Sequence, residues 1–466
     1  MSQIFQATPY DSLQPGMSAE LTRLCRQEDL FVFAQSSGNL NPLHMPDADG
    51  DGDGTPEAKA SGMWLGALVS AVLGNQLPGP GTVLRAQSLR FLGQAHAGET
   101  VVVRAEVANK GPDNAVHLTL TVRTDTGKPL AEGTAEVTAP TTAQRFDASD
   151  VPGLTVQRHV HFDRLLEAAR ALSAIPTAVI APEEPDALGG ALLAAAQTLI
   201  DPILIGDRAL IEAAAEEGGH DLGGARIVDI ASHRAAAAHG IAMINDGQAA
   251  AVMKGHLHTS TLLGEVVKRD GGLRTSRLLS HVFVMDVPGL DRVLMITDAA
   301  VNIAPDLKAK ADIVKNALDL ALALGVAEPK VAVLSAVETV NPAIPSTLEA
   351  AALAKMAERG QIKGGLVDGP LAMDNAISLA AAETKGIRSP VAGRADVLIA
   401  PNMEAGNMIA KELSYLAHAE SAGIVVGARC PVILTSRADG EKARLASCAV
   451  AALHAAGPGA GRGVKE

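Results

Sequence analysis

The 466-residue sequence has very few aromatic side chains and only three cysteines. Phe, Trp and Tyr make up 2% of the chain, whereas apolar residues in total make up 47%. Its cores must therefore be built mainly from Ala, Leu, Val and Ile. Cys25, Cys430 and Cys448 cannot form a disulfide framework, and none belongs to a C-x-x-C pair. This cysteine usage fits a reducing, cytoplasmic setting.

Long hydrophobic runs and an excess of positive charge are also missing. The longest apolar helical stretch, 63–73, is too short for a membrane span, which requires roughly 20 residues. Residues 1–10 have neither a basic region nor an apolar core, so we expect no signal peptide. A formal net charge of −13 argues against nucleic acid or an anionic membrane as the main partner. We therefore expect the main partners of this protein to be small molecules.

Nucleotide-binding signatures and a clear metal-ligand pattern are absent too. No G-x-G-x-x-G follows the first strand pattern of the second half, and no G-x-x-x-x-G-K-[ST] occurs anywhere. His256 and His258 in KGHLHT have no third ligand to pair with in a repeated Cys/His pattern. We therefore expect neither a dinucleotide site nor a metal site at these positions.

One acidic stretch, DADGDGDG (47–54), contains the D-x-D-x-D-G pattern of a calcium loop. An EF-hand loop requires Glu at its twelfth position. That position is Ala58 when counted from Asp47 and Ala60 when counted from Asp49. We interpret the stretch as a solvated acidic loop, and we expect no metal and no permanently bound cofactor in this protein.

The chain is long enough for two or three domains. Residues 62–76 are apolar nearly all round, which is typical of a fully buried helix. Four strand patterns follow this helix, at 82–92, 99–109, 115–124 and 129–138. One buried helix followed by antiparallel strands predicts an α+β hotdog domain over residues 1–145. Residues 146–159 have no sustained periodicity, and we interpret them as a linker.

Residues 160–466 alternate short apolar runs with helical patterns, which predicts a parallel sheet with helices on both faces. The runs lie at 177–181, 202–206, 226–232, 292–298, 330–335, 365–369, 395–400, 423–428 and 431–436. One stretch, 281–298, instead predicts an antiparallel hairpin that turns at Pro288–Gly289. With more than 300 residues, this domain is expected to form two lobes with a cleft between them.

Polar side chains follow most of these strands, where open α/β sheets bind their ligands. They are Lys254, Thr259, Thr297, Asp298, Ser335, Asp368, Asn402, Ser436 and Arg437. Hydroxyl, amide and basic groups of this kind predict an anion site. The helix expected after 431–436 adds free N–H groups and a positive dipole end, which suit phosphate. Asp368 and Asn402 could equally brace turns.

Six ordered stretches of this half resemble the phosphate acetyl/butyryltransferases. They are MKGHLHT (253–259), ITDAAVNIAP (296–305), LSAVETVNPAIPSTLEA (334–350), GGLVDGPLAMDNAIS (364–378), PNMEAGNMIAKEL (401–413) and PVILTSRAD (431–439). The resemblance covers essentially all of residues 160–455. It implies a two-lobed α/β/α sandwich, similar to that of isocitrate and isopropylmalate dehydrogenases. It also implies the reaction acyl-CoA + phosphate ⇌ acyl phosphate + CoA, without a metal or a covalent enzyme intermediate.

In such a site Arg437 offers a bidentate fork for phosphate or for the developing oxyanion. Ser436 and Thr259 can donate hydrogen bonds to phosphate oxygens, and Lys254 adds positive charge. Removing one donor to an oxyanion typically costs roughly 3–4 kcal/mol of barrier.

The group that takes the proton of the CoA thiol is less clear. In the acetyl-specific branch an Asp lies seven residues after the Ser, but that position is Ala443 here. The remaining candidates are Asp439 and Glu441, and this departure resembles the butyryl-type branch. The acyl-chain preference therefore stays open. Ser436-x-x-Asp439 also fits a helix capping box, with Ser as N-cap and Asp at N3.

Three stretches of the first half resemble the MaoC-like (R)-specific enoyl-CoA hydratases: 36–46, 60–79 and 82–101. The resemblance covers roughly 120 residues. It implies an acyl-CoA pocket, with Ser61 and Gly62 matching the segment where the helix N-terminus meets the thioester carbonyl.

The hydratase motif, G-D-x-N-P-x-H, supplies an Asp and a His that activate water. His44 matches the His, and Asn41 and Pro42 are in register, but Asn39 takes the place of the Asp. An amide cannot accept a proton, so one of the two catalytic groups is missing. Alternatively, His44 only packs in a turn. We expect hydration to be weak or absent.

Our leading hypothesis is a phosphate acyltransferase of short-chain acyl-CoA, fused to a hotdog domain that binds acyl-CoA. Hydration as the main activity, or a hotdog domain that only assembles a homo-oligomer, are the alternatives. An NAD-linked decarboxylating dehydrogenase of similar fold is weaker, because its metal requires an Asp cluster that this sequence does not display.

Overall fold

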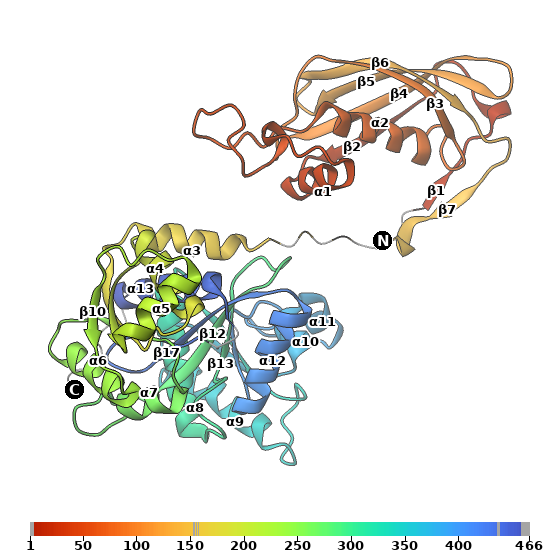
Figure 1. Cartoon of the computed structure of the whole chain (residues 1–466). Coiled ribbons are helices and arrows are strands. Elements are labelled where there is room, and N and C mark those ends of the chain that lie inside the picture. Colours follow the sequence, from red (N-terminus) through yellow and green to blue (C-terminus); the bar gives the residue numbers. More distant parts are fainter. Residues whose placement is uncertain (1–3, 152–153, 155, 157, 436–438, 458–466) are drawn as a thin grey trace. The chain divides into compact units, whose positions relative to one another are not determined.

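The computed structural model describes residues 4–151, 154, 156, 158–435 and 439–457 (Figure 1). The chain divides into two compact units, residues 1–156 and 157–466, and the division falls within 146–159. Each unit has hydrophobic cores of its own.

The smaller unit is an antiparallel sheet with the apolar helix α2 (Gly62–Asn75) packed against it (Figure 1). The strand order is β2-β4-β5-β6-β3. The strands are β2 (Ser18–Leu24), β3 (Val83–Phe91), β4 (Thr100–Lys110), β5 (Ala115–Thr124) and β6 (Pro129–Thr138). Trp64, Leu65 and Val69 of α2 are buried among Val and Leu side chains of the sheet. The prediction of a fully buried helix was wrong, because Met63 is 61% exposed and Ala67 and Ser70 on the same face are exposed too.

Three elements of this unit were not expected from the sequence. They are β2, the helix α1 (Gln27–Ser37) and a two-stranded antiparallel ribbon of β1 (Ile4–Gln6) with β7 (Arg145–Asp147). The ribbon joins segments about 140 residues apart in sequence, and such pairing leaves no local periodicity to detect.

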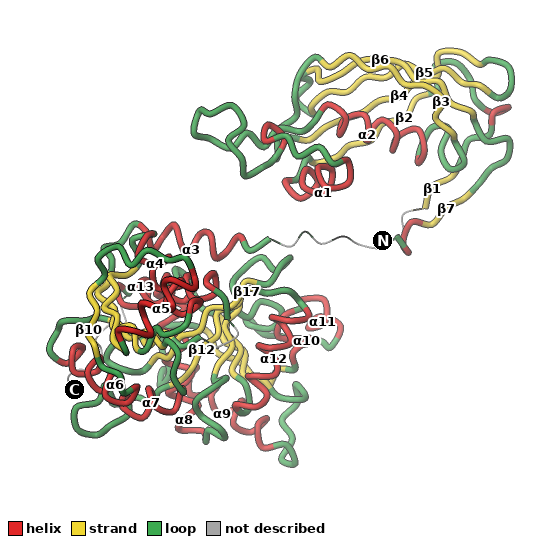
Figure 2. Tube along the Cα trace, in the orientation of Figure 1, coloured by secondary structure: helices red, strands yellow, loops and turns green. Residues whose placement is uncertain are grey.

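The larger unit contains one eleven-stranded sheet between helices (Figure 2). The strand order is β10-β9-β8-β11-β18-β17-β12-β13-β16-β14-β15. The strands are β8 (Ile175–Ile180), β9 (Ile200–Gly206), β10 (Arg226–Asp229), β11 (Ala251–Lys254), β12 (Ser280–Asp286), β13 (Leu294–Thr297), β14 (Lys330–Leu334), β15 (Leu366–Leu371), β16 (Val397–Ile399), β17 (Glu420–Val426) and β18 (Val432–Ile433). Every apolar run predicted as a strand contributes to this sheet.

The sheet is mixed, so the prediction of a parallel sheet was wrong at its centre. The hairpin of β12 and β13 is antiparallel, as predicted. Strand β17 is also antiparallel, to β12 on one side and to β18 on the other. Only residues 427–431 join β17 to β18, and a parallel connection needs a crossover of a dozen or more residues. The reversal separates two groups of parallel strands.

Helices cover both faces of this sheet. They are α3 (Val160–Arg170), α4 (Pro185–Ala196), α5 (Arg208–Gly218), α6 (His233–Asn245), α7 (Thr259–Val266), α8 (Leu307–Ala323), α9 (Pro345–Glu358), α10 (Met373–Ile377), α11 (Leu379–Thr384), α12 (Met403–Leu416) and α13 (Glu441–Ala456). On one face α3, α4, α5, α8, α9 and α13 share one continuous core.

The other face carries two separate cores, one under α6 and α7 and one under α10, α11 and α12. Because successive strand residues point to opposite faces, Val282 joins the continuous core while Phe283 joins a separate one. The two separate cores belong to the two groups of parallel strands. Among the described residues, none of the helices combines the length and the apolar character that a membrane span requires.

Candidate active site

The carboxyl end of β13 carries two of the predicted site residues, Thr297 and Asp298, and both are buried. The Asp298 carboxylate accepts the backbone N–H groups of residues 300–302 at 2.9, 3.0 and 3.2 Å, together with the side-chain amide of Asn302. Asn302 also donates to the Leu279 carbonyl at 2.8 Å. Asp298 thus organises a turn that reaches the start of β12. The Thr297 hydroxyl has no hydrogen-bond partner in the described structure.

Lys254 ends β11, the strand next to β18, and its side chain is buried. Val252 pairs with Val432 and Met253 with Ile433, so the ends of β11 and β18 lie side by side. The Lys254 ammonium donates to the Gly255 carbonyl at 3.3 Å. Thr259, the first residue of α7, is half-buried. The fold therefore places Lys254 beside the end of β18, the strand that precedes Ser436 in the sequence.

Ser436 and Arg437, the two residues on which the sequence interpretation depends most, lie outside the described residues. Asp439 is described and is half-buried. It is not the N3 residue of a capping box, because α13 begins at Glu441 with Gly440 as its N-cap. The Ala/Leu pattern located the helix correctly, but it did not mark its first turn.

Arg444 of α13 is a buried arginine that contacts Thr435, and the sequence analysis did not single it out. It is 2% exposed and donates to the Thr435 hydroxyl at 2.8 Å. Gly190 of α4 leaves room for it, since a Cβ there would lie 2.6 Å from the Arg444 side chain. Burial lowers the pKa of the Arg444 guanidinium, and the charge of Asp439 acts in the opposite direction. A basic residue inside an apolar helix pattern was the available signal.

A second residue that the sequence analysis missed is His281, near the start of β12. Its ring is 1% exposed, and its Nε2 lies 3.4 Å from the Leu434 carbonyl of the β18 end. The ring packs edge-on against Phe283, with centroids 4.5 Å apart. Burial lowers the pKa of His281 below its ordinary value, against the opposing charges of Asp298 and Asp439. The end of β18, with Leu434, and the end of β13, with Asp298, therefore both lie beside this histidine.

The other predicted residues lie elsewhere or hold local structure. Ser335 shares a 2.8 Å hydrogen bond with Ser346, and Asp368 accepts its neighbour's N–H, that of Gly369, at 2.8 Å. Their strands, β14 and β15, are at the far end of the sheet from β11. Asn402 is the N-cap of α12 and accepts the N–H of Ala405 at 2.9 Å. This hydrogen bond holds the first turn of α12, which is the structural role that the sequence analysis left open for Asn402.

A cavity of about 570 Å³ opens beside the Asn302 turn, between the end of α7 and the start of α8. It is lined by Arg274, Arg277, Lys308, Asp306 and Asp312 among other residues. Arg277 forms a salt bridge with Asp319. The lining carries polar groups of both signs, and the cavity adjoins the segment that leads into His281.

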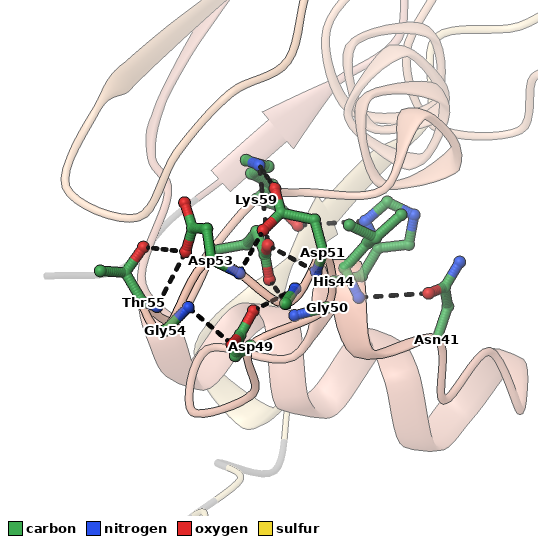
Figure 3. Close-up of polar contacts among 12 residues, drawn as sticks. Asn41, His44, Asp49, Gly50, Asp51, Asp53, Gly54, Thr55 and Lys59 are labelled. Atoms are coloured by element: carbon green, nitrogen blue, oxygen red, sulfur yellow. Dashed lines mark hydrogen bonds and ion pairs between the residues drawn. The ribbon is translucent and has the colours of Figure 1, made fainter.

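In the smaller unit, the predicted hydratase residues lie on the turn after α1 (Figure 3). The His44 Nδ1 is 3.2 Å from the Lys59 carbonyl, which can only accept, so Nδ1 carries the proton and Nε2 a lone pair in the neutral ring. Asn39 is exposed, and its side-chain oxygen accepts the N–H of Asn41 at 3.3 Å. A carboxylate in its place could make the same hydrogen bond.

The predicted thioester segment begins α2. Ser61 is its N-cap and accepts the N–H of Met63 at 3.4 Å. Gly62 is the first helical residue and packs closely against the Phe91 ring of β3. A helix N-terminus capped only by a weak side-chain bond retains free N–H donors for a carbonyl oxygen.

The acidic loop folds on itself beside His44 (Figure 3). Glu57 is 8% exposed and accepts the N–H groups of residues 50 and 51 at 2.6 and 3.1 Å. Asp49 accepts those of residues 52 and 54 at 2.6 and 2.8 Å. Carboxylate oxygens of Asp49, Asp51 and Glu57 come within 4.8 Å of one another. The loop's own hydrogen bonds account for this convergence, and Lys59 lies 3.8 Å from Asp51.

Comparison with known proteins assigns the two units. Residues 231–452 match the family model for phosphate acetyl/butaryl transferase, and residues 7–127 match that for a MaoC like domain. The phosphate acetyltransferase of Rhizobium meliloti is 58% identical over 295 residues, which cover 63% of this chain and 93% of the relative. The phosphate butyryltransferase of Clostridium acetobutylicum is 46% identical over 255 residues, or 55% and 85% of the two chains.

A solved structure agrees. The branched-chain phosphotransacylase of Enterococcus faecalis V583 superposes with a TM-score of 0.53 at 31% identity, over 60% of this chain and 98% of that one. The fold and the ordered strand-end residues define a two-domain protein that joins a MaoC-like domain to an acyltransferase-type unit. The chain belongs to the phosphate acetyl/butyryltransferase family.

Proposed function

We propose that the larger unit transfers short-chain acyl groups between CoA and phosphate, by the reaction acyl-CoA + phosphate ⇌ acyl phosphate + CoA. The observation that carries this proposal is the 58% identity to a phosphate acetyltransferase across 93% of that relative. CoA thioester and phosphate enter as substrates, and the proposal includes no metal and no permanently bound cofactor.

The roles proposed for the side chains follow from charge and position. Arg437 and Ser436 bind phosphate and stabilise the oxyanion that forms on the acyl carbonyl. The buried Lys254 supplies a second cation at the neighbouring strand end. The turn built on Asp298 shapes the side of the site that lies toward β12.

The proposal also includes the two-lobed, isocitrate dehydrogenase-like arrangement of this unit. The reversal at β17 and the two separate cores on one face of the sheet support it. Short-chain acyl phosphates are soluble metabolites, and the three free, buried cysteines support a reducing, cytoplasmic setting.

The test is a panel of acyl phosphates of increasing length with CoA, followed by thioester absorbance. We expect turnover within the C2–C4 range, and the relative rates at C2, C3 and C4 give the chain preference, which Ala443 in place of the Asp of the acetyl-specific branch leaves open. Equal rates with acyl phosphates of every chain length would show that the enzyme does not select its substrate by acyl-chain length. Absence of turnover across C2–C4 would reject the proposed reaction itself.

For the MaoC-like domain we propose acyl-CoA binding and assembly of a homo-oligomer. A groove of about 660 Å³ lies between α2 and β3 and is lined mainly by apolar side chains. Strand β3 is an edge strand, paired only with β6, and its Val83, Leu84 and Phe91 side chains are exposed. An exposed apolar edge strand is prone to pair with another strand, and a second copy offers the same edge.

Substituting this edge should change the oligomeric state and not the transferase rate. We expect the Leu84→Asp/Phe91→Asp variant to lower the molar mass measured by light scattering to that of a smaller assembly, while the acyl phosphate assay is unaffected. Thr119→Asp/Thr121→Asp, on the exposed side of β5, is the control because it adds the same charge away from the edge. An unchanged mass in the double variant would contradict assembly through β3.

A further inference from the structure

The cavity beside the Asn302 turn lies outside the carboxyl end of β13 and at the N-terminal end of α8, the helix that follows this strand. Open α/β sheets bind ligands at such positions, where strand-end side chains meet the N–H groups of a helix. The cavity volume of about 570 Å³ falls within the range of small-molecule sites. A single phosphate ion would fill only a small part of it, so the cavity has room for a ligand of nucleotide size.

The carboxylates that line this cavity already have partners. Asp306 is the N-cap of α8 and accepts the N–H of Ala309 at 2.8 Å. Asp312 accepts the N–H of Leu278 at 3.2 Å, and one of its oxygens lies 3.9 Å from the Lys315 ammonium. Groups of the protein therefore compensate both negative charges.

The cations that line the cavity are only partly compensated. Arg277 forms a salt bridge with Asp319. Arg274 and Lys308 line the same cavity, and among the described residues their side chains have no hydrogen-bond or ion-pair partner. The first N–H groups of α8 add further donors, because a helix cannot pair them internally. This excess of donors and of positive charge favours a bound anion.

The segment that carries Arg274 is held in place by the chain that follows β17. Arg274 forms an antiparallel backbone bridge with Ala428, and the Thr275 hydroxyl donates to the Gly427 carbonyl at 2.7 Å. The same hydroxyl accepts the N–H of Arg277 at 3.1 Å. Because this backbone is fixed before a ligand arrives, less conformational entropy is lost when Arg274 binds an anion.

The remaining wall of the cavity includes apolar side chains, those of Val267, Leu278, Leu279 and Val301. Small-molecule sites typically combine such a wall with a few polar groups that fix the orientation of the ligand. Inorganic phosphate has no apolar part that could use this wall. A phosphorylated adenosine has both parts, a flat ring system and charged phosphate groups.

The position of the cavity indicates which molecule carries this group. Asn302 lines the cavity and donates its side-chain amide to the carboxylate of Asp298. The cavity is therefore one side chain away from the turn that we assign to the transfer site. In CoA the thiol and the phosphorylated adenosine are at opposite ends of an elongated molecule, so the adenosine must lie beside the reacting atoms and not among them.

We propose that this cavity binds the phosphorylated adenosine end of CoA and that Arg274 and Lys308 hold its phosphate groups. This rests on the proposed transfer reaction. A free adenine nucleotide would present the same chemistry to the cavity, and the experiment below separates the two.

The experiment measures the steady-state kinetics of an Arg274→Ala/Lys308→Ala variant with acyl phosphate and either CoA or pantetheine. Pantetheine carries the thiol of CoA without the adenosine and without phosphate. With CoA we expect KM to rise about tenfold or more, because two charge-assisted contacts to phosphate are lost. The kcat should stay within about twofold, since these contacts are the same in ground state and transition state. With pantetheine the variant and the wild type should have equal kcat/KM.

Lys363→Ala/Arg388→Ala is the matched control, because it removes the same two charges from exposed residues of this unit that do not line the cavity. It should keep the wild-type KM for both thiols. Adenosine 3′,5′-bisphosphate, a nucleotide without the pantetheine arm, should inhibit the wild type in competition with CoA. By calorimetry the Arg274→Ala/Lys308→Ala variant should bind it about tenfold more weakly.

Three results would overturn the proposal. An unchanged KM for CoA in the variant would show that the two cations do not hold CoA. An equal loss with pantetheine would show a structural defect. Binding of the bisphosphate without competition against CoA would show a site for a separate nucleotide. A wild type without turnover would instead count against the transfer reaction, whereas calorimetry with CoA and the bisphosphate tests the cavity without any turnover.

Discussion

An Arg437→Ala variant is expected to lose at least about 10³-fold of the acyl-transfer rate, the largest effect that we predict for the larger unit. The reaction brings a phosphate dianion against a thioester carbonyl and builds negative charge on the carbonyl oxygen. A guanidinium can hold two oxygens at once, which a single ammonium group such as that of Lys254 cannot replace. Arg437→Lys should therefore recover only part of the rate.

The measurement is the steady-state rate with acyl phosphate and CoA for both variants, with the thermal transition as a check on folding. Arg429→Ala is the control, because Arg429 is an exposed guanidinium in the same part of the chain that donates to the Gly272 carbonyl at 2.6 Å. It should remain within about twofold of wild type. If Arg437→Ala stayed within tenfold, another residue would have to carry the charge.

An Asn39→Asp variant is expected to raise hydration of crotonyl-CoA by about 10²-fold or more, the largest gain that we predict. The wild-type domain has His44 with a lone pair on Nε2, but an amide at the position where the hydratases have their carboxylate. Asp is almost the same size as Asn, and it can accept the existing hydrogen bond from the N–H of Asn41. The change adds a base without disturbing the turn.

The assay is the loss of enoyl-CoA absorbance with purified wild type and variant. His44→Ala in the Asn39→Asp background should return the rate to the wild-type level, since water activation requires both groups. Asn41→Asp is the control for added charge, because Asn41 is also exposed and lies on the same turn. An Asn39→Asp variant no faster than wild type would show that the domain has lost more than one catalytic group.

The local patterns of the sequence were reliable where a residue's own neighbours decide its structure. The all-round apolar run 62–76 is helix α2, and the hairpin predicted at 281–298 is present. The direction of β17 was missed, because an apolar run of that length has no periodicity that separates parallel from antiparallel pairing. The short loop of residues 427–431 was the usable signal, and it was overlooked.

The candidate site shows the same division. Lys254, Thr297 and Asp298 could be selected from the sequence because each ends or follows an apolar run. His281 could not, since it lies inside a strand pattern, 153 residues from the Leu434 carbonyl that it contacts. Arg444 could not be selected for a similar reason, because it lies inside the helical pattern of α13. A side chain whose partner is far away in the sequence leaves no spacing that a motif could capture.

The sequence by itself determined that the chain has two domains, where most of its strands and its longer helices lie, and which family the larger unit resembles, because these depend on local periodicity and ordered motifs. Only the tertiary structure decided which strand ends meet. The antiparallel β17 sets the β13 end, with Asp298, and the β18 end, with Leu434, around one buried histidine. Hydrogen bonds between distant strands and the burial of charge fix that arrangement, and neither is encoded at any single position.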